Sequence, residues 1–269
     1  MTIHDFLNIR WEDDGLPLIE PARTSPVLAD PTVLFPSETP NGNWVLFAHT
    51  VWGIHRYESE DGVSWVDRGM AVRNAMRPFC RRVDGAFNLS YEKYRPFAVV
   101  AQILPRPPRW RSRLEMRSSP DLVHWSGARP LLASEPEWAV DAELGTSVSN
   151  PCLVPLPTTH DQPNAFRLYF SASLAYVPDC GFSEPRYIGC ADGASPDGPF
   201  TGRPHPVIDP VDDDLPGVLA PSDGWRASHV YACDCRQAPD GTWYLYYNAR
   251  DGWYKAQGTE RIGRLVGRV

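Results

Sequence analysis

Three related phrases decide the fold: SEDGVSW at residues 59–65, SSPDLVHW at 118–125 and GASPDGPF at 193–200. Each combines small residues with an aspartate and ends on an aromatic side chain. Serine, aspartate and glycine favour tight turns, because short polar side chains hydrogen-bond to nearby backbone and glycine adopts positive φ. The recurrence of one such phrase along the chain indicates a repeat architecture.

Strand patterns surround these turns. Hydrophobic segments that open on a short polar step are ADPTVLF at 29–35, MRPFCRRV at 76–83, SNPCLVPL at 149–156 and, without the proline, ASHVYACDC at 227–235. Each is followed by an aromatic-rich segment: NWVLFAHT, GAFNLSYEKY, FRLYFSAS and TWYLYYNAR. Aromatic and β-branched residues favour strands. One repeat therefore predicts a four-stranded antiparallel blade with the aspartate turn before its last strand.

The repeats predict an all-β β-propeller that forms a single domain over residues 1–269. Four repeats can be counted, and a fifth would have to lie in 84–112 or 205–225. The last repeat ends before its outer strand, and the segment Trp11 to Pro21 supplies one, so the N- and C-terminal segments are expected to close the ring. Trp65, Trp125 and Phe200 occupy equivalent positions and are expected to pack between blades. The alternative is a β-sandwich with coincidental turns.

Charge and composition exclude several classes of partner. The formal net charge is −7 and the basic residues are scattered, which disfavours nucleic acid. No segment approaches 18 uninterrupted apolar residues and the first residues do not read as a leader, so no membrane partner and a cytoplasmic location are expected. The six cysteines lack a C-x-x-C spacing, which favours buried thiols and predicts no metal site.

Candidate site residues come from two places in each blade. Antiparallel pairing brings the start of the first strand and the end of the second to one mouth of the ring. Candidates at strand starts are Asp30, Arg77, Asn150, Arg226 and His229. Candidates in or after second strands are His49, Trp52, Glu92, Glu184, Arg186, Arg250 and Trp253. Guanidinium and carboxylate groups that hydrogen-bond to hydroxyl groups, together with the faces of aromatic rings, suit a small carbohydrate.

Two of these segments carry a resemblance to a known clan. ADPTVLF, and EPRYIGCADGASPDGPF at 184–200, resemble the propeller glycosidases of glycoside hydrolase families 43 and 32. The resemblance implies five blades and three acidic residues near the axis: a base, a tuning carboxylate and an acid. It places Asp30 as base or nucleophile and Glu184 as general acid, with Glu92 second for the acid. The tuning position reads Asn150, an amide where the family has a carboxylate.

The resemblance thus implies a glycoside hydrolase acting on a small glycoside or oligosaccharide, furanosides included. The expected substrate-binding residues are Arg77, Asn150, Arg226, His229, His49, Trp52, Arg186, Arg250 and Trp253. No cofactor is predicted, and an axial cation such as calcium is left open. Two other functions stay open: a non-catalytic carbohydrate-binding propeller, because of Asn150, and a glycoside phosphorylase, because Arg77 and Arg226 could hold phosphate.

Overall fold

The computed structural model describes residues 10–12, 15–156, 166–177, 181–185, 187–205, 225, 229–251 and 258–268. The first two aspartate turns of the sequence take the same form in it. Asp61 Oδ1 accepts the backbone N–H groups of Val63 and Ser64 at 2.8 and 2.7 Å. Asp121 Oδ1 accepts the two corresponding N–H groups at 2.9 and 2.8 Å. These turns join the third strand of a blade to the segment that leads to its fourth strand, as the repeat predicts.

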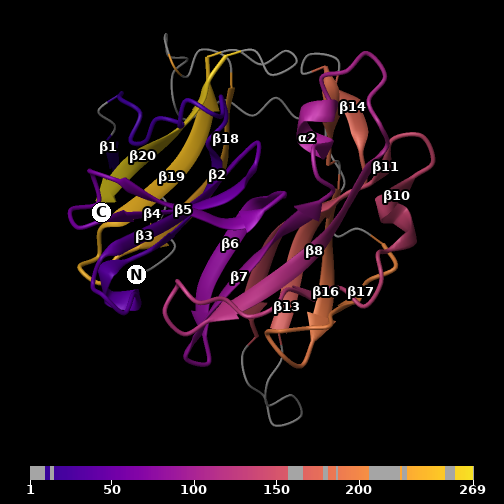
Figure 1. Ribbon diagram of the computed structural model, residues 1–269. Helices are drawn as coiled ribbons and strands as arrows, with labels where there is room; N and C mark the ends of the chain where they lie inside the picture. The colour runs from indigo at the N-terminus through magenta and orange to yellow at the C-terminus, as the bar shows by residue number, and fades with distance from the viewer. Residues whose placement is uncertain are drawn as a thin grey trace.

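The strands form four blade-like sheets (Figure 1). Blade 1 contains β2 (Ala29–Leu34), β3 (Trp44–Thr50), β4 (Gly53–Ser59) and β5 (Val66–Arg73). Blade 2 contains β6 (Ala75–Val83), β7 (Ala86–Tyr94), β8 (Trp110–Ser119) and β9 (Arg129–Pro130), and is extended by β11 (Gly145–Thr146) and β10 (Val140–Asp141). Blade 3 contains β12 (Val148–Pro155), β13 (Phe166–Ala172), β16 (Tyr187–Gly193) and β17 (Thr201–Gly202).

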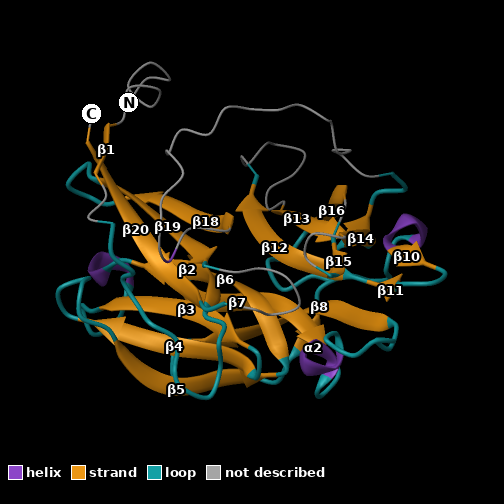
Figure 2. Ribbon diagram, turned by 90° about the horizontal axis from the view of Figure 1, so that it is seen from above, coloured by secondary structure: helices purple, strands orange, loops and turns teal. Residues whose placement is uncertain are grey.

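Blade 4 joins the two ends of the chain. It contains β18 (His229–Gln237), β19 (Trp243–Arg250) and β20 (Glu260–Arg268), and its outer strand is β1 (Arg10–Glu12). β1 pairs antiparallel with β20, with Trp11 opposite Gly267 (Figure 2). The N- and C-terminal segments therefore close the ring, which confirms that prediction and covers an edge that would otherwise be open.

The all-β fold is confirmed, but five blades are not. The region 84–112 belongs to blade 2, so it adds no further blade. The second region expected to hold a blade, 205–225, lies almost wholly outside the described residues. Small elements complete the described parts: α2 (Ala98–Ala101), the hairpin β14 (Ala175–Val177) and β15 (Phe182–Glu184), and the 3-10 turns η1 (Pro36–Glu38) and η2 (Glu137–Ala139). No helix in these parts is long and apolar enough to span a membrane.

The hydrophobic core lies between neighbouring blades. Leu34 and Phe47 of blade 1 share a buried cluster with Leu89 of blade 2. Similar clusters join blade 2 to blade 3 and blade 4 to blade 1. The aromatic residues after the aspartate turns contribute as predicted: Trp125 packs edge-on against Phe47 at 5.9 Å, and Trp65 and Phe200 pack into the other two clusters. Blade contacts of this kind fix where the inner strands begin.

Candidate active site

A cavity of about 850 Å³ opens where the inner strands of the blades begin. Its lining includes six residues that the sequence predicts for a site: Asp30, His49, Trp52, Arg77, Asn150 and Glu184. They come from three blades and from the β14–β15 hairpin. The volume falls within the range of about 300–1,000 Å³ that is typical of small-molecule sites.

A repeated backbone irregularity places three of these side chains. Asp30, Arg77 and Asn150 each precede proline and have positive φ values of 52°, 54° and 48°. The pairing of each inner strand with its neighbour shifts register at this point, which marks a β-bulge. Bulges re-aim side chains and are common beside active sites. All three side chains line the cavity.

Arg77 connects three carboxylates. Its guanidinium group lies 2.8 Å from Glu92 Oε2 and 2.8 Å from Glu184 Oε2, and its Nε lies 3.9 Å from Asp30 Oδ2. Burial disfavours the charged guanidinium, but the charges of Glu184, Glu92 and Asp30 outweigh burial and raise its pKa. Arg77 is therefore a fixed positive charge that orients the acidic side chains around it.

Glu92 is fully buried. One carboxylate oxygen accepts the hydrogen bond from Arg77, and the other accepts one from Trp110 Nε1 at 3.0 Å. Glu92 is not among the residues that line the cavity. Its position suits a residue that holds Arg77 in place.

Asp30 is held as a carboxylate. Its Oδ2 atom lies 3.1 Å from His49 Nδ1, and both side chains are mostly buried. Burial raises the pKa of Asp30, but the hydrogen bond and charge of His49 and the charge of Arg77 have the larger combined effect, so the pKa falls below its usual value of 3.8. A group that stays ionised in this way can accept a proton or attack an electrophilic carbon.

Glu184 has the opposite tendency. It ends β15, and its side chain is 32% exposed at the cavity, so a ligand could reach it. Burial raises its pKa above the usual 4.5; Arg77 opposes this, whereas the negative charges of Asp30 and Glu92 add to it. A carboxyl group with a raised pKa beside one with a lowered pKa is the arrangement that acid–base catalysis uses.

Asn150 lines the cavity without joining the charged network. Its amide nitrogen donates a hydrogen bond to Ser171 Oγ at 3.2 Å and lies 3.5 Å from Ser149 Oγ. Ser171 belongs to β13, the strand beside β12. The amide therefore stands in blade 3 at the place that the resemblance assigns to a tuning carboxylate.

The other predicted residues are Trp52, two residues of blade 4 and three residues outside the described parts of the chain. Trp52 is 40% exposed and lines the cavity, and its indole Nε1 donates to the carbonyl of Thr24 at 2.8 Å. His229 in β18 and Arg250 in β19 are paired across the two strands, and only their backbones are described. The remaining predicted residues, Arg186, Arg226 and Trp253, lie outside the described residues.

Two residues that the sequence reasoning missed belong to this site, Trp110 and Glu260. Trp110 begins β8 and Glu260 begins β20, so both stand at the start of a third strand. Glu260 is buried and lines the cavity, and burial raises its pKa well above the usual value, with Asp30 and Glu184 adding to the effect. In an antiparallel blade the third strand starts at the same mouth as the first, so this topological signal could have identified both.

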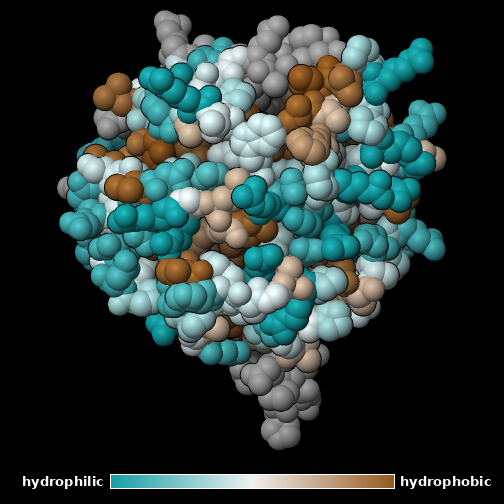
Figure 3. All heavy atoms as spheres, in the orientation of Figure 1, coloured by the Kyte–Doolittle hydropathy of each residue, from teal (hydrophilic) through white to brown (hydrophobic). Residues whose placement is uncertain are grey.

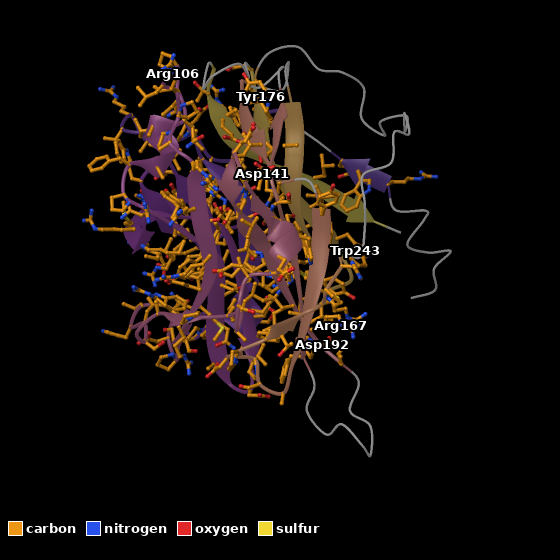
Figure 4. All side chains as sticks on the ribbon, turned by 90° about the vertical axis from the view of Figure 1, so that its right-hand side faces the viewer. Arg106, Asp141, Arg167, Tyr176, Asp192 and Trp243 are labelled. Atoms are coloured by element: carbon orange, nitrogen blue, oxygen red, sulfur yellow. The ribbon has the colours of Figure 1, made fainter. Side chains whose placement is uncertain are left out.

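One end of the described structure carries the cavity, and the other carries an ion pair between Arg167 and Asp192. Figure 4 places Tyr176, which belongs to β14 near the cavity, at one end of the molecule, and the pair Arg167 and Asp192 at the other. Arg167 Nε lies 2.6 Å from Asp192 Oδ1, a partly exposed ion pair between β13 and β16. Within the parts of the chain described, no group of three or more His, Cys, Asp and Glu side chains is placed to hold a metal ion.

Comparison with known proteins gives structural similarity only. No family model matches the chain, and no curated protein matches it in sequence. A family 117 glycoside hydrolase of Zobellia galactanivorans aligns with 96% of this chain and 90% of its own, at 14% identity and a TM-score of 0.59. A GH43_1 enzyme of Xanthomonas citri aligns with 94% of this chain and 89% of its own, at 12% identity and a TM-score of 0.49. The first of these similarities confirms that this chain has the propeller fold expected from its resemblance to propeller glycosidases.

Proposed function

We propose that this propeller is a glycoside hydrolase. The observation that carries the proposal is that Asp30 and Glu184 share Arg77 within one cavity, while their surroundings move their pKa values in opposite directions. Pairs of carboxyl groups separated in this way divide the roles of acid and base. The structural similarity to the family 117 enzyme agrees with this reaction class.

In the proposed reaction Glu184 donates its proton to the leaving oxygen as the bond between that oxygen and the anomeric carbon breaks. Asp30 either takes a proton from the attacking water or attacks the anomeric carbon itself, forming an ester that water then hydrolyses. Either route consumes one water. When Asp30 acts as base, the two carboxyl groups end with exchanged protonation states and return to their starting states by proton exchange with solvent; when Asp30 forms the ester, Glu184 takes a proton from the hydrolytic water and Asp30 is released as a carboxylate. His49 and Arg77 keep Asp30 ionised and in place.

The proposed substrate is a small glycoside or oligosaccharide. A cytoplasmic location stays a prediction from the sequence. Trp52 and Asn150 are proposed to contact its ring, because an exposed indole suits C–H surfaces and an amide can bind a hydroxyl group. A phosphorylase is less well supported. The guanidinium of Arg77 is already paired with carboxylates, and Arg226, the other predicted phosphate ligand, lies outside the described residues.

The test is release of nitrophenol from aryl furanosides and pyranosides, with and without phosphate. We expect phosphate-independent turnover by the wild type, loss of turnover in Asp30→Asn, and normal turnover in Asp192→Asn, whose ion pair lies at the other end of the molecule. A requirement for phosphate would favour the phosphorylase. Sugar binding with no turnover of any substrate would favour a binding propeller.

A further inference from the structure

The wall of the cavity is far less polar than its floor. Charged side chains gather at the floor around Arg77. One wall follows α2 and the loop after it. Two polar residues of this segment line the cavity, Gln102 and Arg109, and their side chains donate hydrogen bonds to backbone carbonyls. The other five lining residues of the segment are Val99, Val100, Ile103, Pro107 and Pro108. None of these five side chains has a polar atom, so a sugar hydroxyl placed against them would lose hydrogen bonds to water without replacement.

The same segment is unusually apolar where it meets solvent. Of the eleven large hydrophobic residues exposed in the described parts of the chain, four fall between residues 97 and 104: Phe97, Val100, Ile103 and Leu104. Figure 3 shows hydrophobic side chains gathered at the upper right, where Figure 1 places α2. Exposed apolar clusters on a monomer commonly mark binding sites.

The apolar surface continues beside the proposed acid. Phe182 and Pro185 flank Glu184 closely in the chain and line the cavity, as does the buried Leu174. Because Glu184 protonates the leaving oxygen in the proposed reaction, the leaving group must lie near these side chains. The part of the substrate that departs would therefore contact apolar surface.

We propose that the cavity binds glycosides with an apolar leaving group, an alkyl or aryl aglycone that lies between the α2 segment and the β14–β15 hairpin. The inference rests on the proposed hydrolase function for the position of the leaving group. The occupant follows from the continuity of this apolar wall with the charged floor, which makes both parts of one cavity. A cavity of about 850 Å³ has room for a ligand of this composition.

The test separates binding from turnover. Binding of S-alkyl thioglycosides of xylose, arabinose and galactose, from methyl to octyl, is measured by calorimetry, since the sulfur analogues resist hydrolysis. Hydrolysis of the matching O-alkyl glycosides from ethyl to octyl is measured in parallel, because the leaving alcohols along this series have similar acidity. We expect Kd to fall about fourfold for each added methylene over the first few carbons, and kcat/KM to rise in step.

The variant Val100→Ser/Ile103→Ser should flatten both trends, because it makes the apolar wall polar at two exposed positions. The matched control is Val66→Ser/Val123→Ser, which alters two exposed valines that do not line the cavity and should keep both trends.

The outcomes distinguish this inference from the hydrolase proposal. Chain-length dependence of Kd without any hydrolysis would support the apolar subsite and overturn the hydrolase. Hydrolysis with a Kd independent of chain length, or no thioglycoside binding at all, would overturn the subsite. A dimer in sedimentation that only Val100→Ser/Ile103→Ser dissociates, with unchanged chain-length dependence, would identify the segment as a contact between copies and also overturn it.

Discussion

Asp30 in blade 1 and Asn150 in blade 3 occupy the same place in their blades. Each precedes proline at a bulge of the inner strand, and their φ values are 52° and 48°. Yet Asp30 lies 3.1 Å from His49 and belongs to the charged network, whereas Asn150 donates to the hydroxyl of Ser171 in its own blade. The repeated backbone supplies positions, and the side chain at each position decides whether it takes part in charge chemistry.

Arg77 in blade 2 occupies the third of these equivalent positions and has a different function. It shares the bulge and the positive φ, but it supplies a cation that binds carboxylates from blade 2 and from the β14–β15 hairpin. Three equivalent strand starts thus present an anion, a cation and a neutral amide to one cavity. Substitutions at the three blades should therefore have graded and different effects.

The largest effect is expected at Asp30. Asp30→Asn keeps the shape of the side chain but removes the base or nucleophile, so kcat should fall by about 10²–10⁴-fold, with little change in the far-ultraviolet circular dichroism. Initial rates on the best aryl glycoside measure this. A variant that keeps wild-type kcat would show that the charge of blade 1 has no part in the reaction and would remove the distinction between blades 1 and 3.

The next effect concerns the anchoring of Arg77 and is read as stability. Glu92→Gln leaves the buried guanidinium with one fewer counter-charge, and disrupting a buried ion pair costs about 3 kcal/mol of unfolding free energy or more. Urea denaturation with an unchanged m-value measures the loss.

Asp192→Asn is the control for this measurement, because it removes partly exposed ion pairs with Arg167 and Arg203, whose loss should cost less than about 1 kcal/mol. Equal losses in the two variants would mean that Arg77 is not held by burial and charge as the structure indicates.

The starts of the inner strands could be predicted from the sequence, but the network of ion pairs and hydrogen bonds between their side chains could not. The X-Pro steps and alternating apolar residues predicted the inner strands, and antiparallel topology brought Asp30, Arg77 and Asn150 to one mouth. The ion pair of Arg77 with Glu92, and the hydrogen bond from Trp110, depend on distances across strands that no spacing along the chain encodes.

The same holds for the opposed pKa shifts of Asp30 and Glu184, which arise from burial, from His49 on the strand beside Asp30 and from charges on other parts of the chain. Glu260 was not predicted because it begins a third strand, and the prediction covered only the first two strands of each blade.

A smaller and substrate-dependent effect is expected for Glu184→Gln. Loss of the acid should lower kcat by about 10²-fold for alkyl glycosides, but far less for nitrophenyl glycosides, whose leaving group needs no proton. The pH profile of kcat/KM should also change. Asp30 must be ionised, so activity falls as pH drops through a pKa below 3.8, and Glu184 must be protonated, so activity falls as pH rises through a pKa above 4.5.

Only the alkaline limb of this profile should disappear in Glu184→Gln. An alkaline limb that survives the substitution would assign the acid to another group, of which buried Glu260 is the first to examine because its pKa is also raised.

The smallest effect is expected at Asn150, which completes the comparison with Asp30. Asn150→Ala removes one amide that can bind a substrate hydroxyl, so KM should rise by less than about tenfold, while kcat stays near the wild-type value. Asn150→Asp is the more informative variant, because it gives blade 3 the carboxylate that the resemblance assigns to this position. A further negative charge in the cavity should raise the pKa of Glu184 and shift the alkaline limb of kcat/KM to higher pH. An unshifted limb would mean that a charge at the strand start of blade 3 does not affect the pKa of the acid.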